Sequence, residues 1–372
     1  MTSIIYVGMD VHTTNYTLCC YSMEDDRFFA EVQVEPDAKN ILKYLARIEK
    51  QQSRDCRIVC GYEAGCLGYS LYHQLHAHGI DCVILAPTTM MTKPGKRIKT
   101  DRRDARLISK CLAFHTYSPV YIPTEVDGAV KEYIRMRDDA NSALARVKQQ
   151  IIAFCIRHGK IHDGKSYWTN KHLEWLSSLD LGNKILSEVL QEYLIRYYQL
   201  REQVDMYDMR INELAQAEPY RQKVEKLGCF RGIAAHTALS FCVEVGDFRR
   251  FATAQQFASY LGLVPGECSS GDKQQYTGIT KAGNSHLRKL LVETAQVFGR
   301  SATKSGKSVA LKERQAKCDS LTVAYADKAN ARLKKKYFKI AMRSKVNIAK
   351  TAVAREMACF IWGMMTDNIS CA

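Results

Sequence analysis

Apolar residues in the first third of the chain come in short runs, followed by stretches with helical spacing. Short runs rich in β-branched and aromatic residues predict strands, whereas apolar positions three and four residues apart predict amphipathic helices. The predicted strands cover residues 4–9, 16–21, 28–34, 57–62 and 80–86. The predicted helices cover residues 38–50, 69–79 and 104–115. An antiparallel meander of three strands is therefore followed by strands that alternate with helices.

The element order β-β-β-α-β-α-β-α describes a ribonuclease H-like domain of the α/β class. Side chains at the ends of neighbouring parallel strands converge at one edge of such a sheet. Asp10 and Glu63 each end an apolar run, and Asp101 and Asp104 lie at the start of the helix that follows. We therefore expect these four carboxylates to face one another at one edge of the sheet.

Four carboxylates in one place repel one another strongly unless cations lie between them. Mg²⁺ prefers carboxylate, water and phosphate oxygens, so the four acids predict a Mg²⁺ site, with Mn²⁺ as the alternative. Lys96, Arg97 and Lys99 precede the second acidic pair and suit a docked phosphate backbone. For Asp101 and Asp104 alone, the alternative is an acidic first turn that complements the helix dipole.

The middle of the chain predicts two long helices, over residues 125–159 and 187–227, with a Trp-rich connector from Tyr167 to Trp175 between them. Both helices are polar, with apolar positions that are only loosely periodic. Long helices of this kind are typical of a coiled coil, either antiparallel or between two chains. We favour dimerisation through this region; the alternative is a helical hairpin that folds onto its own domain.

The last third of the chain predicts mainly helices, over residues 234–243, 248–261, 286–298 and from 328 onward. A loop over residues 262–283 is rich in Gly, Ser and Lys, which is typical of a phosphate-contacting or catalytic loop, the alternative being a plain connector. From Lys328 to Arg355 there are ten Lys or Arg and no acid. This run predicts a nucleic-acid surface. Its expected contacts are Lys334, Lys335, Lys336, Lys339 and Arg343.

The composition agrees with such a surface, because a net charge of +15 over 372 residues favours a polyanionic partner. No apolar run is long enough to span a membrane, and we expect no signal peptide. The cysteines are irregularly spaced, and Cys56, Cys60 and Cys66 lack a second ligand pair for zinc. They predict reduced, mostly buried thiols in a cytosolic protein.

Several motifs together resemble the DEDD transposases, the insertion-sequence recombinases related to the Piv DNA invertase. In the first domain they are Gly8-Met9-Asp10-Val11-His12, Tyr62-Glu63-Ala64-Gly65 and Lys99-Thr100-Asp101-Arg102-Arg103-Asp104-Ala105. Further along they are Trp168…His172-Leu173-Glu174-Trp175, Ser269-Ser270-Gly271…Ile279-Thr280-Lys281-Ala282-Gly283-Asn284, Ala324-Tyr325-Ala326-Asp327 and Ala354-Arg355-Glu356. The chain departs from the family's Pro-Gly-Ile-Gly-like turn at Cys229-Phe230-Arg231-Gly232-Ile233, which puts backbone contacts to phosphate there in doubt.

The resemblance implies three parts: a RuvC-like domain over residues 1–118, a helical coiled-coil region over 119–219 and a mainly α-helical transposase domain over 220–372. It implies that Asp10, Glu63, Asp101 and Asp104 bind the metal. Ser270 corresponds to the family's nucleophile, with Ser269 beside it as the alternative, and Lys281 is a further expected nucleic-acid contact. The family also implies donor and target DNA and a structured guide (bridge) RNA as partners. It implies a dimer or tetramer in which one subunit's carboxylates act with another's serine, and a cytoplasmic, prokaryotic protein associated with the nucleoid.

Other classes of function fit the residues less well. A metal-dependent RuvC-like nuclease or junction resolvase needs the carboxylates but no serine. An actin-like ATPase would use residues 8–14 as a phosphate loop, but it needs further Gly-rich loops that are not visible before residue 262. A non-catalytic nucleic-acid binder gains nothing from four aligned acids. The resemblance, together with these comparisons, predicts a serine recombinase of an insertion sequence, guided by RNA and dependent on Mg²⁺.

Overall fold

The computed structural model describes residues 3–52, 56–65, 67–87, 90, 100–267, 275–300 and 306–369. The chain divides into two compact units, residues 1–122 and 123–372. The boundary at residue 219 between a middle and a last domain stays a prediction. In the described part of the chain, no helix is both long and apolar enough to cross a membrane.

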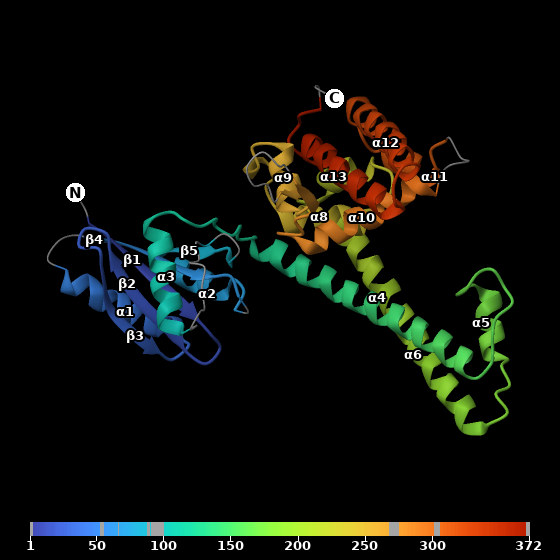
Figure 1. Cartoon of the computed structure of the whole chain (residues 1–372), viewed down its shortest axis with the longest axis horizontal. Helices are drawn as coiled ribbons and strands as arrows, with labels where there is room; N and C mark the ends of the chain where they lie inside the picture. Colours follow the sequence, from blue (N-terminus) through green and yellow to red (C-terminus); the bar gives the residue numbers. More distant parts are fainter. Residues whose placement is uncertain are drawn as a thin grey trace. The chain divides into compact units, whose positions relative to one another are not determined.

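The N-terminal unit is built on a five-stranded mixed sheet with the order β3-β2-β1-β4-β5 (Figure 1). Its strands are β1 (Ser3–Val11), β2 (Tyr16–Ser22), β3 (Arg27–Val34), β4 (Cys56–Glu63) and β5 (Asp81–Leu85). Its helices are α1 (Ala38–Gln51), α2 (Ser70–Ala77) and α3 (Asp101–Ala113). β1 pairs antiparallel with β2 and parallel with β4, and β4 pairs parallel with β5. The predicted order of elements is confirmed.

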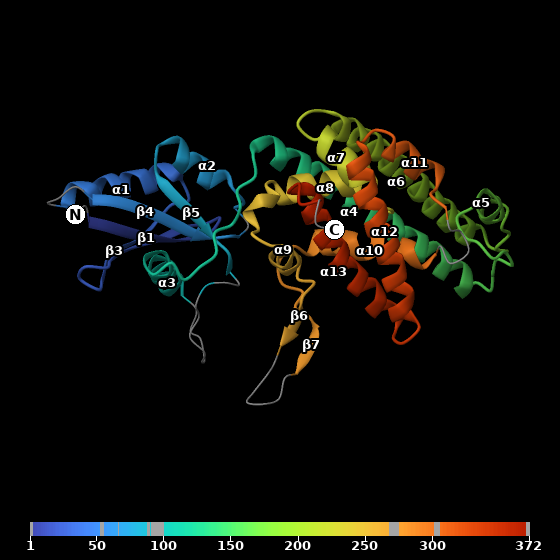
Figure 2. The ribbon, with the colours of Figure 1, turned by 90° about the horizontal axis from the view of Figure 1, so that it is seen from above.

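Helices cover both faces of this sheet, with α1 and α2 on one side and α3 on the other (Figure 2). Side chains alternate between the faces of a strand, so Val7 and Met9 pack toward α1 whereas Tyr6 packs toward α3. At Gly8 the backbone of α3 comes so close that a Cβ atom would lie 2.0 Å from the carbonyl oxygen of Ala105. Glycine at this position therefore allows α3 to lie directly on the central strand.

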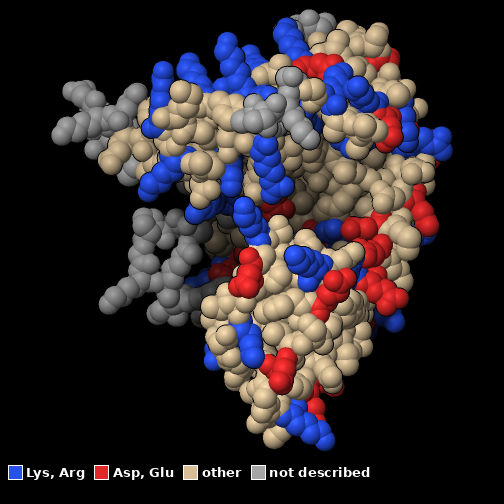
Figure 3. All heavy atoms as spheres, turned by 90° about the vertical axis from the view of Figure 1, so that its right-hand side faces the viewer, with Lys and Arg blue, Asp and Glu red and all other residues tan. Residues whose placement is uncertain are grey.

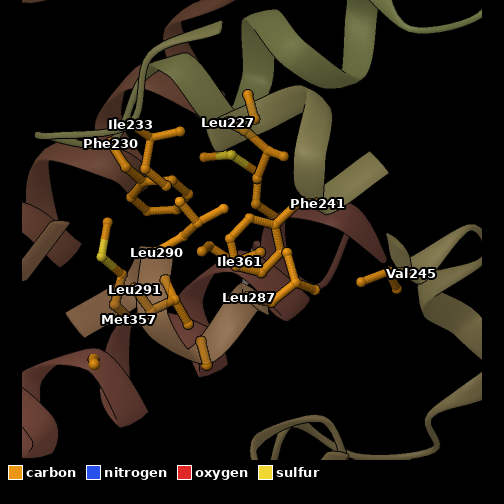
Figure 4. Packing of buried hydrophobic residues seen from close by; sticks show 14 of the residues in the cluster. Leu227, Phe230, Ile233, Phe241, Val245, Leu287, Leu290, Leu291, Met357 and Ile361 are labelled. Carbon is orange, nitrogen blue, oxygen red and sulfur yellow. The ribbon is translucent and has the colours of Figure 1, made fainter. Parts of the chain in front are cut away.

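The C-terminal unit is mainly helical, with one two-stranded sheet. The first helices are α4 (Glu125–Arg157), α5 (Asn170–Ser177), α6 (Lys184–Gln216), α7 (Arg221–Gly228), α8 (Ala235–Val245), the 3₁₀ helix η2 (Phe248–Arg250) and α9 (Ala254–Tyr260). The remaining elements are β6 (Pro265–Glu267), β7 (Tyr276–Ile279), α10 (Ser285–Gly299), α11 (Val309–Gln315), α12 (Ser320–Ala341) and α13 (Val346–Met365). α8 lies close to α10 and α13 in a core that includes Phe241, Leu291 and Ile361 (Figure 4).

The two long helices α4 and α6 pack antiparallel against each other within one chain. Near one end of the pair Ile134 shares a cluster with Ile211, and near the other Phe154 shares a cluster with Leu190. Arg137 on α4 also binds both carboxylate oxygens of Asp208 on α6, at 2.7 and 2.9 Å. Of the two arrangements expected for a coiled coil, the structure shows the antiparallel one within a single chain, and dimerisation through these helices stays a prediction.

Three details differ from the pattern of the sequence. The predicted helix over residues 187–227 is interrupted between α6 and α7, because Pro219 lacks an N–H donor and disfavours helical backbone at the residue before it. The predicted helix over 248–261 is broken, since Asp247 caps η2 and Thr253 caps α9. The segment 262–283, taken as a loop, contains the antiparallel pair β6–β7.

Candidate active site

The parallel pair β1–β4 brings Asp10 and Glu63 to corresponding positions. Met9 on β1 is paired with Tyr62 on β4, and the two acids come one residue later on each strand. A Cβ atom on Gly8 or Gly61 would meet α3, and a strand repeats its orientation every two residues. Asp10 and Glu63 are therefore on the side of the sheet that α3 covers.

Three potential ligand atoms come together at this edge, one each from Asp10, His12 and Asp101, all within 4.8 Å of one another. Nε2 of His12 lies 3.3 Å from Oδ2 of Asp10. Asp101 is in the first turn of α3, where the side chain of Thr100 caps the helix by accepting from the N–H of Arg103. The predicted convergence of strand end and helix start is thus present for Asp10 and Asp101.

The side chain of Asp10 is partly buried and lies close to other carboxylates, an arrangement that a bound cation would stabilise. Burial raises its pKa, His12 lowers it, and the charges of Asp104 and Asp101 raise it, with a net upward shift. Its Oδ2 atom is buried and, apart from the approach of His12, has no hydrogen-bond partner within the described residues. Two carboxylates and an imidazole are ligands that divalent cations accept, so the residues present fit a bound metal.

Glu63 and Asp104 do not belong to this three-residue group among the described side chains. Asp104 lies one helical turn after Asp101 and is close enough to raise the pKa of Asp10. Glu63 is exposed at the end of β4. The structure thus gathers Asp10, Asp101 and Asp104 around one edge, with Glu63 on the neighbouring strand.

His12 was not predicted as a ligand from the sequence. It follows Asp10 by two residues at the end of β1, and this spacing puts both side chains on the same side of an extended strand. The Asp-x-His spacing at the end of an apolar run is the signal that could have identified it.

A second candidate region is the β6–β7 hairpin, whose base is held firmly against the start of α10. The N–H of Lys281 donates to the carbonyl of Gly262 at 3.1 Å, and that of Asn284 donates to the carbonyl of Tyr260 at 3.0 Å. A Cβ atom on Gly283 would lie 2.0 Å from this same Tyr260 oxygen. Ser269 and Ser270, between the two strands, lie outside the described residues.

The predicted nucleic-acid contacts lie partly on α12. Lys335, Lys339 and Arg343 are exposed, whereas Leu333 and Tyr337 on the same helix are buried in the core. Lys334 and Lys336 are half-buried, and Lys281 is exposed after β7. Lys and Arg side chains gather in the upper part of the face shown in Figure 3. Lys96, Arg97 and Lys99 lie outside the described residues.

The fold and the acidic site agree with what known families show. Residues 7–156 match the family model of a DEDD-type transposase, and residues 225–314 match that of the IS116/IS110/IS902 transposase family. The protein y4qE of Sinorhizobium fredii is 36% identical over 307 residues, which cover 82% of this chain and 75% of the relative.

Two further relatives carry names that state their activity. The transposase for insertion sequence element IS1533 of Leptospira borgpetersenii is 32% identical, over 90% of this chain and 95% of the relative. The transposase for insertion sequence element IS1111A of Coxiella burnetii is 26% identical, over 68% and 71% respectively.

A mixed sheet with an acidic edge and a helical C-terminal unit defines this chain as a DEDD-type transposase, an enzyme that acts on DNA. It belongs to the IS116/IS110/IS902 transposase family of insertion sequences. The DEDD-type domain implies that it binds a divalent metal.

Proposed function

We propose that this transposase recombines DNA through a serine nucleophile and a Mg²⁺-binding DEDD site, guided by a structured bridge RNA. The observation that carries the proposal is the base of the β6–β7 hairpin. Backbone hydrogen bonds and the close approaches at Gly262 and Gly283 hold both of its ends in place. A reactive serine needs such a support, because small displacements of a nucleophile cost large factors in rate.

Asp10, Glu63, Asp101 and Asp104 are the proposed metal-binding residues, and His12 joins them as a ligand or as a hydrogen-bond donor to Asp10. Bound Mg²⁺ would stabilise the negative charge that develops on a phosphodiester under attack. Mn²⁺ is the alternative, since it accepts the same carboxylate ligands as Mg²⁺.

Ser270 is the proposed nucleophile. Its Oγ forms a bond to the phosphorus of a DNA phosphodiester while the bond from phosphorus to the 3′ oxygen breaks, and the hydroxyl proton ends on that oxygen. In the second step a 3′-hydroxyl attacks the phosphoserine, so the serine is released and the DNA is rejoined. No net hydrolysis takes place, and the energy of the phosphodiester bond is conserved.

Guidance by RNA is supported by the surface of the protein. A direct reader of DNA presents an element that contacts base edges in the major groove, and the sequence contains no convincing helix-turn-helix or zinc finger. The exposed cations of α12 instead suit phosphate contacts that are independent of sequence. Specificity would then come from base pairing between the RNA and both DNA partners.

Assembly into a dimer or tetramer is supported by an exposed apolar stripe on α6. Ile195, Tyr198, Met206 and Met209 recur at nearly helical spacing and are all exposed. Replacing Ile195 and Met209 with Lys should shift the protein toward monomer in sedimentation. The same change at exposed Ile161 and Ile185 is the control and should leave the oligomer intact. Equal effects in both double variants would argue against this surface.

The decisive experiment is denaturing electrophoresis of labelled DNA after incubation with protein, guide RNA and Mg²⁺. Wild type should give a protein–DNA adduct, Ser270→Ala should give none, and Ser269→Ala should retain it. Loss of the adduct only in Ser269→Ala would move the nucleophile by one residue. Cleaved ends without any adduct in wild type would favour the nuclease, for which the acidic group alone suffices. Recombination after complete removal of RNA would refute the guided mechanism.

A further inference from the structure

Helices α9, α12 and α13 line an open cavity of about 630 Å³. This volume is within the range of small-ligand sites, roughly 300–1,000 Å³. The side chains that line it include Arg332, Lys336, Arg355, Glu356, Phe360 and Trp362. Three cations face one carboxylate, so the cavity has an excess of positive charge.

Glu356 holds two of these cations in position. Its Oε2 lies 2.5 Å from Nζ of Lys336, and its Oε1 accepts a hydrogen bond from Nε of Arg332. Burial raises the pKa of Glu356, but Lys336 and Arg332 outweigh burial and hold that pKa below its ordinary value. The carboxylate is therefore ionised and fully used by its two partners.

Arg355 is the cation left over. It is exposed, and no carboxylate in the described part of the chain lies within ion-pair distance of it.

Aromatic side chains also line the cavity. Nε1 of Trp362 donates a 3.1 Å hydrogen bond to the carbonyl of Phe251, and the Arg332 guanidinium lies 5.9 Å from the centre of the Phe360 ring. Unpaired positive charge beside aromatic rings is how proteins hold unstacked nucleotides.

We infer that this cavity binds a single unstacked nucleotide of the nucleic acid bound along α12, with its phosphate on Arg355 and its base against Phe360 and Trp362. The inference rests on the proposed binding of nucleic acid to α12. Arg332 and Lys336 line the cavity from this helix, and Lys335 and Lys339 follow on its exposed surface. A strand that follows the exposed cations would thus pass the mouth of the cavity.

The test is photocrosslinking with a single-stranded RNA that carries 5-iodouridine and with the matching DNA that carries 5-iododeoxyuridine. In full-length wild type, irradiation should attach the probe to Phe360 or Trp362, as mapped by mass spectrometry of the peptides. Arg355→Ala should reduce this adduct on the order of tenfold, as expected for the loss of a charge-assisted contact. Arg355→Lys should restore part of it.

The control is Lys312→Ala on α11, which removes the same charge from an exposed position outside the cavity and should leave the adduct unchanged. An adduct with only one probe identifies RNA or DNA as the source of the nucleotide. If both probes bind with strong salt dependence but neither labels Phe360 or Trp362, or if Arg355→Ala labels as well as wild type, the inference is wrong while the proposed function stands. Absence of any binding to either probe would overturn both.

Discussion

Nε2 of His286 lies 2.7 Å from Oδ2 of Asp138, and this contact joins two helices across 148 residues of sequence. The other ring nitrogen of His286, Nδ1, lies 3.5 Å from Oε1 of Glu244, whose side chain is only 3% exposed. A carboxylate beside each ring nitrogen favours the doubly protonated, cationic form of the imidazole. The further ionisable groups in this network are His236 and Arg137 beside Asp138, and Lys131 and Arg135 beside Glu244.

This network predicts a pH dependence of stability. Burial lowers the pKa of His286, but Asp138 and Glu244 outweigh it and raise the pKa above its ordinary value. Because the pKa of His286 is higher in the folded than in the unfolded protein, protonation of the ring stabilises the fold. This stabilisation is fully present at pH values below the pKa of the unfolded protein, about 6.5, and is lost as the pH rises through the pKa of the folded protein. His286→Gln should therefore lower the free energy of unfolding most near pH 6, by about 1.5–3 kcal/mol, and less at pH 9.

Urea unfolding across this pH range checks the prediction, with exposed His158→Gln in the same unit as the control. Below pH 5 the change of stability with pH is set mainly by the carboxylates. His286, Lys131 and Arg135 outweigh the effect of burial and lower the pKa of Glu244 to about 2. A carboxylate whose pKa is lowered on folding stabilises the fold at pH values above its pKa in the unfolded protein. This stabilisation is lost as the pH falls through its pKa in the folded protein. A His286→Gln effect that is independent of pH would mean that the ring is neutral.

The close contact between Gly8 and α3 predicts a large effect of one methyl group. A Cβ atom would lie 2.0 Å from the Ala105 oxygen and 2.4 Å from the Ser109 nitrogen, both backbone atoms of α3. Gly8→Ala should lower the free energy of unfolding of the N-terminal unit by about 3 kcal/mol or more, as over-packing does. Gly65→Ala is the control, because its nearest atom would be 3.8 Å away. Similar losses in both variants would contradict the close packing.

Removing one negative charge from the acidic edge should lower activity without lowering the stability of the fold. Asp101→Asn relieves its repulsion with Asp10, so the metal-free variant should be as stable as wild type or more so. Strand cleavage should fall on the order of 10²–10³-fold or more. The stabilisation by Mg²⁺, about 2.7 kcal/mol at one hundred times the dissociation constant, should shrink in thermal unfolding.

Glu49→Gln on α1 is exposed and serves as the matched control, with activity and metal response as in wild type. Chelation of the metal by EDTA should abolish cleavage in wild type and in this control alike. Full cleavage by Asp101→Asn would remove Asp101 from the metal-binding set.

The exposed cations of α12 and of the turn that follows it should contribute to binding through phosphate contacts. Charge reversal of Lys335, Lys339 and Arg343 to Glu should weaken binding to unrelated nucleic acids alike. Each lost contact should reduce the slope of log affinity against log salt by roughly 0.7–0.9. The control reverses the charges of Lys165, Lys171 and Lys184, which are exposed in the segment between the end of α4 and the start of α6. Equal slopes for the two triple variants would indicate an effect of net charge alone.

The sequence predicted the N-terminal unit well because its signals are local. Short apolar runs predict strands, and parallel strands place Asp10 and Glu63 at one edge regardless of the details of packing. The Asp138–His286 contact could not be predicted, because no local sequence pattern around either residue indicates a contact with a residue 148 positions away. The β6–β7 pair was missed because its strands have three and four residues, too few for an alternating pattern to stand out.

The position of β1 in the sheet has a consequence for synthesis of the chain. β1 is made first, yet it is the central strand, and its partner β4 and covering helix α3 come much later. Contacts between distant segments slow folding, and an unpaired apolar strand is prone to aggregate. Until β4 has been synthesised, β1 can therefore pair on one side only, with β2. The acidic edge can therefore be completed only after α3 has been synthesised, because Asp101 and Asp104 lie on that helix.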